Sequence, residues 1–218
     1  MRELLLIGAS GLAREVASLL RGQADPRRLL LIDDRLELRG TSFDGMRVVG
    51  GLAELADHPN AQIVVCVGRG ASRAALVDRL AELGVPADRY ARVVHPASPI
   101  PDSCRVGAGS IVLAGVVLTT DVVLGDHVVV MPHVTLTHGN RVDSFATLCA
   151  GVALGGDVHI GSRAYLGMNV AVRERVRIGA GSTIGMAAAV LSDVPAGETW
   201  IGVPAASISH SWNTRASA

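Results

Sequence analysis

The fold is decided by residues 100–190, of which residues 106–142 read VGAGSIVLAGVVLTTDVVLGDHVVVMPHVTLTHGNRV. An aliphatic side chain returns at every sixth position of this stretch without an insertion. These positions are Ile100, Val106, Val112, Leu118, Leu124, Val130, Leu136, Val142, Leu148, Leu154, Ile160, Leu166, Val172, Ile178, Ile184 and Val190. A six-residue period is typical of a parallel β-helix, in which each unit forms one flat face of a prism and units three apart stack as parallel strands. We therefore predict a rod of about five coils.

The regularity of this rod also predicts self-association. Its flat faces repeat too evenly for the chain to fold back and cover them. Closed rotational symmetry is the commonest arrangement in oligomers, and a three-sided prism suits a threefold axis, so we expect a homotrimer. The spacing alone does not fix whether the coil is left- or right-handed.

Composition limits the classes of protein to consider. The pattern changes near residue 95 of the 218, which predicts two domains, 1–95 and 96–208, followed by a tail at 209–218. A net charge of zero argues against a nucleic-acid partner or an anionic membrane. Apolar runs are too short for membrane insertion, and we expect a cytoplasmic protein without a signal segment. Cys66, Cys104 and Cys149 lack metal-ligand spacing and are expected to be buried, reduced thiols.

The first domain alternates short apolar runs with helical patterns. Apolar runs at 3–7, 29–32 and 61–67 predict buried strands, and apolar residues at helical spacing predict helices at 12–21 and 71–83. Strands that alternate with helices indicate a parallel sheet covered on both faces, a Rossmann-like α/β arrangement.

The turns that follow these strands carry candidate binding residues. Ligands of such sheets bind at the carboxyl ends of the strands, where a helix amino terminus offers free N–H groups to a phosphate. Gly8, Ser10 and Gly11 follow the first strand, the pair Asp33 and Asp34 the second, and Gly68 the third. The acidic pair could accept hydrogen bonds from a ribose or a base. The same residues could also serve only as tight turns, because the three-glycine dinucleotide fingerprint is incomplete.

One repeat unit of the rod, residues 136–141 (LTHGNR), departs most from the pattern. Its fifth position, elsewhere small or apolar, is Asn140, and its third is His138. Repeats tend to break their own rule where function requires it. A neutral imidazole can accept a proton from an amine or hydroxyl that attacks a thioester, so His138 is the candidate general base. Asn140 or Asp143 could orient it.

Together, the glycine turn, the acidic pair, His95-Pro96 at the junction, the hexapeptide rod and His138 resemble a known family. The chain looks like the bacterial sialic-acid O-acetyltransferases and the bacillosamine-pathway UDP-amino-sugar N-acetyltransferases. That resemblance implies a nucleotide-sugar-binding α/β domain, a left-handed β-helix, and trimers that hold acetyl-CoA between adjacent rods. It also implies acetyl transfer from acetyl-CoA to an amine or hydroxyl of a sugar.

The resemblance assigns roles by position. The general base falls on His138. The sugar-nucleotide contacts fall on Ser10, Gly11, Leu12, Asp33, Asp34 and Gly68, and the acetyl-CoA contacts fall on Thr147, Met168 and Met186. The chain departs from the family at three places: Gly139 stands where an acidic residue usually follows the base, Thr147 replaces a second histidine, and Leu12-Ala13 replace a histidine and a glycine.

Two other functions are compatible with the sequence. His133 and His138 have the spacing of two zinc ligands in γ-class carbonic anhydrases, but Ala97 stands at the position of the third ligand, and catalytic zinc needs three. Alternatively, the chain could be a non-catalytic, nucleotide-sugar-binding trimer, since the acidic neighbour of His138 is missing.

Overall fold

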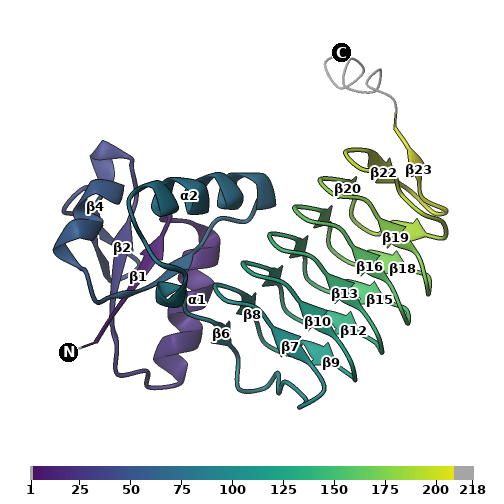
Figure 1. Ribbon diagram of the computed structural model, residues 1–218, viewed down its shortest axis with the longest axis horizontal. Helices are drawn as coiled ribbons and strands as arrows, with labels where there is room; N and C mark the ends of the chain where they lie inside the picture. Colours follow the sequence, from purple (N-terminus) through teal and green to yellow (C-terminus); the bar gives the residue numbers. More distant parts are fainter. Residues whose placement is uncertain (1, 209–218) are drawn as a thin grey trace.

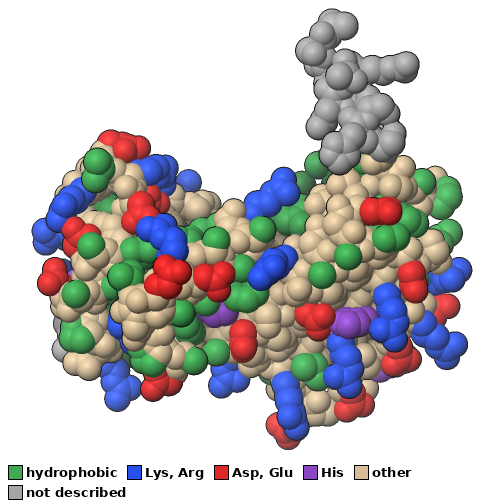
Figure 2. Space-filling view, turned by 45° about the horizontal axis from the view of Figure 1, so that its top comes forward, with side chains coloured by type: hydrophobic (Ala, Val, Ile, Leu, Met, Phe, Trp, Pro, Cys, Tyr) green, Lys and Arg blue, Asp and Glu red, His purple; other side chains and the backbone are tan. Residues whose placement is uncertain are grey.

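The computed structural model describes residues 2–208, so the predicted tail lies outside the described residues. An N-terminal α/β domain lies beside the first coils of a prism-shaped rod, which continues away from it (Figure 1). In the space-filling view the two parts form lobes on either side of a saddle (Figure 2). Among the described residues, no helix has the length and apolar character needed to span a bilayer.

The N-terminal domain is built on a five-stranded sheet with the order β3-β4-β2-β1-β5, in which only β3 is antiparallel to its neighbour. Its elements are β1 (Glu3–Ile7), α1 (Gly11–Gly22), β2 (Arg28–Ile32), η1 (Leu36–Leu38), β3 (Ser42–Phe43), β4 (Met46–Gly50), η2 (Leu52–Asp57), β5 (Gln62–Val65), α2 (Gly70–Glu82) and η3 (Ala87–Arg89). The predicted Rossmann-like arrangement is confirmed. Sequence reasoning missed β3 and β4, where Asp44 and Gly45 form a tight turn with positive φ.

The two faces of this sheet are covered differently. The side chains of Leu4, Leu6 and Val64 pack with α1 in one apolar cluster that also contains rod residues. Side chains from the opposite face, such as Ile63, pack instead against η2 and the Leu80 side of α2. Helix α1 therefore lies between the sheet and the rod. Leu83, the last residue of the predicted helix, follows the end of α2 and is exposed.

The rod is a left-handed parallel β-helix whose short strands form three stacked sheets. The sixfold period predicts the parallel β-helix, and the family resemblance implies its left hand. We name its faces by what lies on them. The covered face consists of β6 (Val93–Val94), β8 (Ile111–Val112), β11 (Val129–Val130), β14 (Thr147–Leu148), β17 (Tyr165–Leu166), β20 (Thr183–Ile184), β22 (Thr199–Ile201) and β23 (Ala206–Ser207). The small-residue face consists of β9 (Val117–Leu118), β12 (Thr135–Leu136), β15 (Ala153–Leu154), β18 (Ala171–Val172) and β21 (Ala189–Val190). The charged face consists of β7 (Arg105–Val106), β10 (Val123–Leu124), β13 (Arg141–Val142), β16 (His159–Ile160) and β19 (Arg177–Ile178).

The repeat fixes which side chains are inside. The aliphatic ladder from Val106 to Val190 is buried and forms one continuous core. From Gly109 to Ala187 the fourth residue of every unit turns the corner in the left-handed region, with φ between 54° and 74°. His127 and His133 occupy two such corner positions. The third residue of each unit lies on the same edge, directly before the corner residue. His138 occupies such a third position, before the corner residue Gly139.

The N-terminal domain covers the beginning of one rod face. Ile111, Leu113 and Val129 of the covered face share an apolar cluster with Leu12 and Val16 of α1. Strand β6 already pairs with β8 of the rod, so the β-helix ladder begins at Val93, just before the predicted boundary. This packing leaves the other two faces of the rod free within one chain.

Candidate active site

The expected sugar-nucleotide residues gather at the carboxyl edge of the N-terminal sheet. Ser10 caps α1: its hydroxyl accepts a hydrogen bond from the Ala13 N–H at 3.2 Å and donates one to the Cys66 carbonyl at 2.6 Å. No atom lies within 4 Å of where a Cβ on Gly11 or Gly68 would stand, so the backbone is open at both turns. A helix amino terminus with space at this turn could receive a phosphate.

The acidic pair lines a neighbouring cavity of about 200 Å³ together with Gly8. Asp33 accepts hydrogen bonds from the Arg35 side chain and from the Ala9 N–H, and the Arg35 bond in particular lowers its pKa to about 2. Asp34 accepts a hydrogen bond from the Leu52 N–H and forms an exposed ion pair with Arg79 at 2.9 Å. Both carboxylates thus hold the loops in place and remain beside the cavity.

Leu12 does not share this position. Its side chain is buried in the cluster between the sheet and the covered face of the rod, and only its backbone remains near the turn. A contact of Leu12 with the sugar nucleotide therefore stays a prediction for its backbone in the first turn.

His138 lies on the edge between the small-residue face and the charged face of the rod. Its side chain is 63% exposed, and its Nδ1 lies 4.0 Å from Oδ2 of Asp157, a residue of the next coil. The sequence interpretation missed Asp157 because it lies nineteen positions after the histidine. The only signal that could have revealed it is the period of eighteen residues per coil, which places position 157 above position 139.

Neither orienting group proposed from the sequence contacts His138. Asn140 is fully buried in the prism, where its side-chain amide donates a hydrogen bond to the Gly155 carbonyl at 2.7 Å. Ser110 occupies the same position of its unit and bonds the Gly125 carbonyl in the same way, so Asn140 links successive coils. Asp143 pairs instead with Nε2 of His159, at 3.0 Å, on the charged face. Both interpretations are therefore corrected.

The predicted acetyl-CoA residues separate into two groups. Met168 and Met186 lie one above the other on the edge between the covered and small-residue faces, and their side chains are 50% and 69% exposed. Thr147 is buried at the junction between the domains, where its hydroxyl donates to the Gly68 carbonyl and accepts from Arg73. Its hydroxyl therefore makes both of these hydrogen bonds within the chain, and its role as an acetyl-CoA contact stays a prediction.

The residues expected to bind the sugar nucleotide and the candidate base lie in different parts of one chain. The N-terminal domain rests on the covered face, while His138 lies on the edge of the three-sided prism that is opposite this face. Within a single chain the candidate base is therefore on the edge of the rod farthest from the face that the N-terminal domain covers.

The domain junction contains a buried cationic residue that sequence reasoning did not single out. Arg73 of α2 is completely buried, and burial lowers its pKa to about 10. Beside it, His127 stacks on Phe145 at 5.1 Å between ring centroids and meets the edge of Tyr90. Burial lowers the pKa of His127 to about 4, so this histidine is a neutral packing residue at neutral pH.

The geometry does not favour zinc in one chain. His133 occupies the edge between the covered and small-residue faces, whereas His138 occupies the next edge, so the two rings project from different edges of the prism. Within residues 2–208, no group of three or more His, Cys, Asp or Glu side chains is close enough to hold a metal ion.

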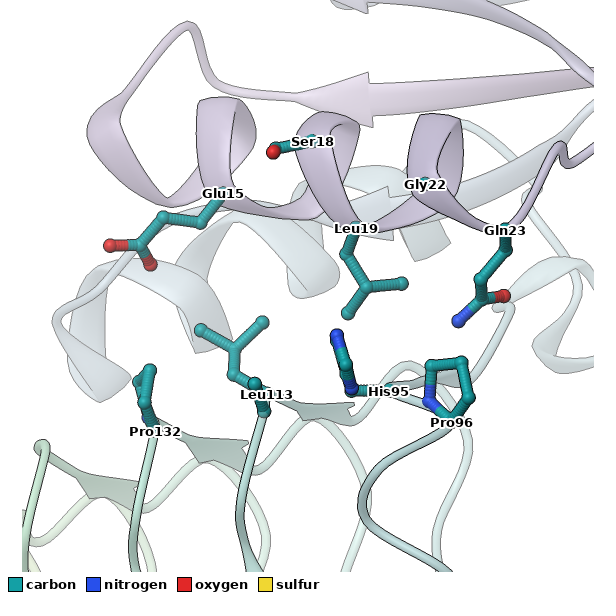
Figure 3. A pocket seen from close by; sticks show the side chains of 10 residues that line it. Glu15, Ser18, Leu19, Gly22, Gln23, His95, Pro96, Leu113 and Pro132 are labelled. Atoms are coloured by element: carbon teal, nitrogen blue, oxygen red, sulfur yellow. The ribbon is translucent and has the colours of Figure 1, made fainter.

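A second cleft, of about 450 Å³, lies next to where α1 packs on the rod, between the second half of α1 and the first coils of the rod (Figure 3). Glu15, Leu19 and Gln23 line it from the helix, and His95 and Pro132 line it from the rod. Partial burial raises the pKa of the Glu15 carboxyl. The cleft contains the His95-Pro96 junction that contributed to the family resemblance.

This combination of a Rossmann-like domain and a left-handed hexapeptide rod with an exposed edge histidine defines a class of two-domain acyltransferases. Residues 3–80 match the family model described as the PglD N-terminal domain. The acetyltransferase domain of PglB from Neisseria gonorrhoeae FA1090, solved with acetyl coenzyme A, is 30% identical, with a TM-score of 0.86 over 95% of this chain and 99% of that one.

Two further relatives agree. A variant of GDP-perosamine N-acetyl transferase from Caulobacter crescentus, solved with CoA and GDP-perosamine, is 26% identical, with a TM-score of 0.87 over 96% of this chain and 98% of that one. The UDP-N-acetylbacillosamine N-acetyltransferase of Bacillus subtilis (strain 168) is 25% identical over 122 residues, or 52% of each chain. That match spans about half the length of this curated relative. The chain belongs to the PglD-type family of sugar acetyltransferases.

Proposed function

We propose that this protein transfers the acetyl group of acetyl-CoA to an amine of a nucleotide-linked amino sugar. The observation that carries the proposal is the match, over nearly the whole of both chains, to an acetyltransferase domain solved with acetyl coenzyme A. The relatives named for a sugar substrate act on amino sugars carried by UDP or GDP, which favours an amine over a hydroxyl acceptor.

In this reaction His138 is the general base. Its Nε2 accepts a proton as the amine nitrogen attacks the thioester carbonyl; the C–S bond then breaks, and the proton passes to the CoA sulfur. The products are the acetamido sugar and free CoA, with no covalent enzyme intermediate. A high exposure of the imidazole in a single chain suits a group that meets a substrate held by another surface.

We further propose that the working form is a homotrimer. The outward side chains of the small-residue face are Val117, Thr135, Ala153, Ala171 and Ala189, which permit close approach of a second rod. The charged face, with three arginines and a histidine among its five outward positions, suits solvent instead. Packing through the small-residue face would bring the edge of Met168 and Met186 near the His138 edge of a neighbour and leave a groove for acetyl-CoA.

A cytoplasmic location fits this proposal. Three free cysteines, all buried, suit a reducing compartment, and acetyl-CoA is available there.

The activity is tested with a panel of UDP-, GDP- and dTDP-linked amino sugars, with acetyl-CoA as donor and free thiol as readout. We expect turnover with at least one amine acceptor and its loss in His138→Ala. His159→Ala, on the charged face, is the matched control and should retain turnover. Turnover unchanged in His138→Ala would refute the assignment of the base, and no thiol release with any acceptor would refute acetyl transfer to these sugars.

The assembly is tested by light scattering coupled to size exclusion. Ala171→Arg places a charged side chain on the small-residue face and should yield monomers, whereas Val123→Arg on the charged face should remain trimeric. A monomeric parent protein, or a trimeric Ala171→Arg variant, would contradict the proposed packing.

A further inference from the structure

We propose that Asp157, supplied by the next coil of the rod, is the positioning residue for His138. This inference rests on the proposed function, because it concerns the base of that reaction. Nδ1 of His138 and Oδ2 of Asp157 lie 4.0 Å apart, and both side chains are more than half exposed. Catalytic hydrogen bonds are often long without substrate and shorten in the reactive complex.

The backbone holds the two residues in this relation. The Asp157 N–H donates a hydrogen bond to the His138 carbonyl at 2.9 Å, one of the regular links between coils. The two Cα positions are therefore fixed by the ladder, and only side-chain rotation determines the distance between the ring and the carboxylate. The left-handed φ of 58° at Asp157 is the corner conformation that recurs throughout the rod.

Two glycines make room for this pair. A Cβ on Gly139 would collide with the carboxylate of Asp157, and a Cβ on Gly156 would collide with the imidazole of His138. Each side chain thus lies over a glycine of the other coil. Because Gly139 has no side chain, the carboxylate of Asp157, eighteen positions after Gly139, has room beside His138.

No other described residue competes for either partner. Asp157 forms no other ion pair and accepts no side-chain hydrogen bond within residues 2–208. The other two candidates are committed elsewhere, Asn140 to the Gly155 carbonyl and Asp143 to His159. Asp157 is therefore the carboxylate available to the ring.

The geometry assigns each ring nitrogen a task. A hydrogen bond from Nδ1–H to Asp157 leaves Nε2 unprotonated, so that its lone pair can take the proton of the attacking amine. When Nε2 becomes protonated, the carboxylate stabilises the imidazolium until Nε2 returns the proton to the CoA sulfur. Asp157 stays ionised throughout and binds neither substrate.

The test compares steady-state kinetics of Asp157→Asn and Asp143→Asn. The second is a matched control because it disrupts the shorter histidine–carboxylate pair, 3.0 Å, on the charged face. We expect Asp157→Asn to lower kcat by about tenfold or more, with both KM values and the melting temperature little changed. Asp143→Asn should retain kcat.

A relocation experiment separates positioning from a structural role. Asp157→Gly removes the carboxylate, and adding Gly139→Glu places one at the usual family position, where the collision no longer occurs. Partial recovery of kcat in the double variant, relative to Asp157→Gly, supports the proposal. Unchanged kcat in Asp157→Asn, while His138→Ala is inactive, overturns it and leaves the proposed function standing. Unchanged turnover in His138→Ala refutes the proposed function itself.

Discussion

Arg73 offers the most demanding test of how the two domains are joined. Its guanidinium donates hydrogen bonds to the carbonyls of five residues and to one hydroxyl, drawn from both the N-terminal domain and the rod. The acceptors are Val67 O, Gly68 O, His127 O, Phe145 O, Ala146 O and Thr147 Oγ1. Replacing Arg73 with Met keeps much of the apolar stem but removes every one of these donors.

The expected loss follows from the acceptors that remain. Three of them, the carbonyls of Val67, His127 and Phe145, receive no other hydrogen bond from the described residues. A buried polar group without a partner costs about 1–3 kcal/mol. The saved cost of burying the guanidinium offsets part of this loss. We therefore expect Arg73→Met to reduce the free energy of unfolding by about 3–5 kcal/mol.

The assay is thermal and urea unfolding followed by circular dichroism. A loss of this size should lower the melting temperature by about 10 °C. Arg79→Met is the matched control, because Arg79 is on the same helix and forms only an exposed ion pair, worth at most about 1 kcal/mol. If Arg73→Met shifted the transition no more than Arg79→Met, the junction would not depend on this guanidinium.

Three other outcomes follow from the structure. Gly70→Ala should destabilise the protein by about 1–3 kcal/mol because its Cβ would overlap the Phe145 carbonyl, whereas Gly22→Ala, with open space around it, should not; equal melting temperatures would contradict this. The pKa of His127 is lowered from 6.5 to about 4, so the unfolded chain binds a proton that the folded chain does not. Stability should therefore be complete above pH 6.5 and decline by about 3 kcal/mol towards pH 4, and this part of the slope should vanish in His127→Phe. Met186→Glu should raise KM for acetyl-CoA through repulsion of its phosphates and leave the melting temperature unchanged, since the side chain is 69% exposed; an unchanged KM would argue against this edge as the cofactor groove.

The fold was largely predictable because its determinants are local and repeated. Sixteen aliphatic positions at a constant interval predict a parallel β-helix but not its handedness, and every one from Val106 onward is buried as expected. Strands β1, β2 and β5 were also clear, since each is a continuous apolar run. Strand β4 was not, because Arg47 interrupts its apolar pattern, MRVVG, which therefore does not mark a buried strand.

The site was predictable only in part, because its remaining determinants are contacts between distant segments. The turns at Ser10, Asp33 and Gly68 follow from the rule that parallel strands end at one edge. The burial of Thr147 does not, because it depends on where α2 docks against the rod. Arg73 is similar: an arginine on a helix is usually solvated, and only the docked carbonyls explain its burial.

The proposed pairing of His138 with Asp157 shows how a motif residue can be displaced along the sequence of a β-helix. Neighbouring strands lie about 4.8 Å apart, so a side chain one coil later stands as close to a given residue as its own neighbour in sequence. An acidic group can therefore move eighteen positions along the chain and remain beside the same ring, provided that glycines clear the way. Gly139 and Gly156 provide that space here. A residue missing from a motif on such a rod can therefore have its counterpart at the same edge of the next coil, eighteen positions later.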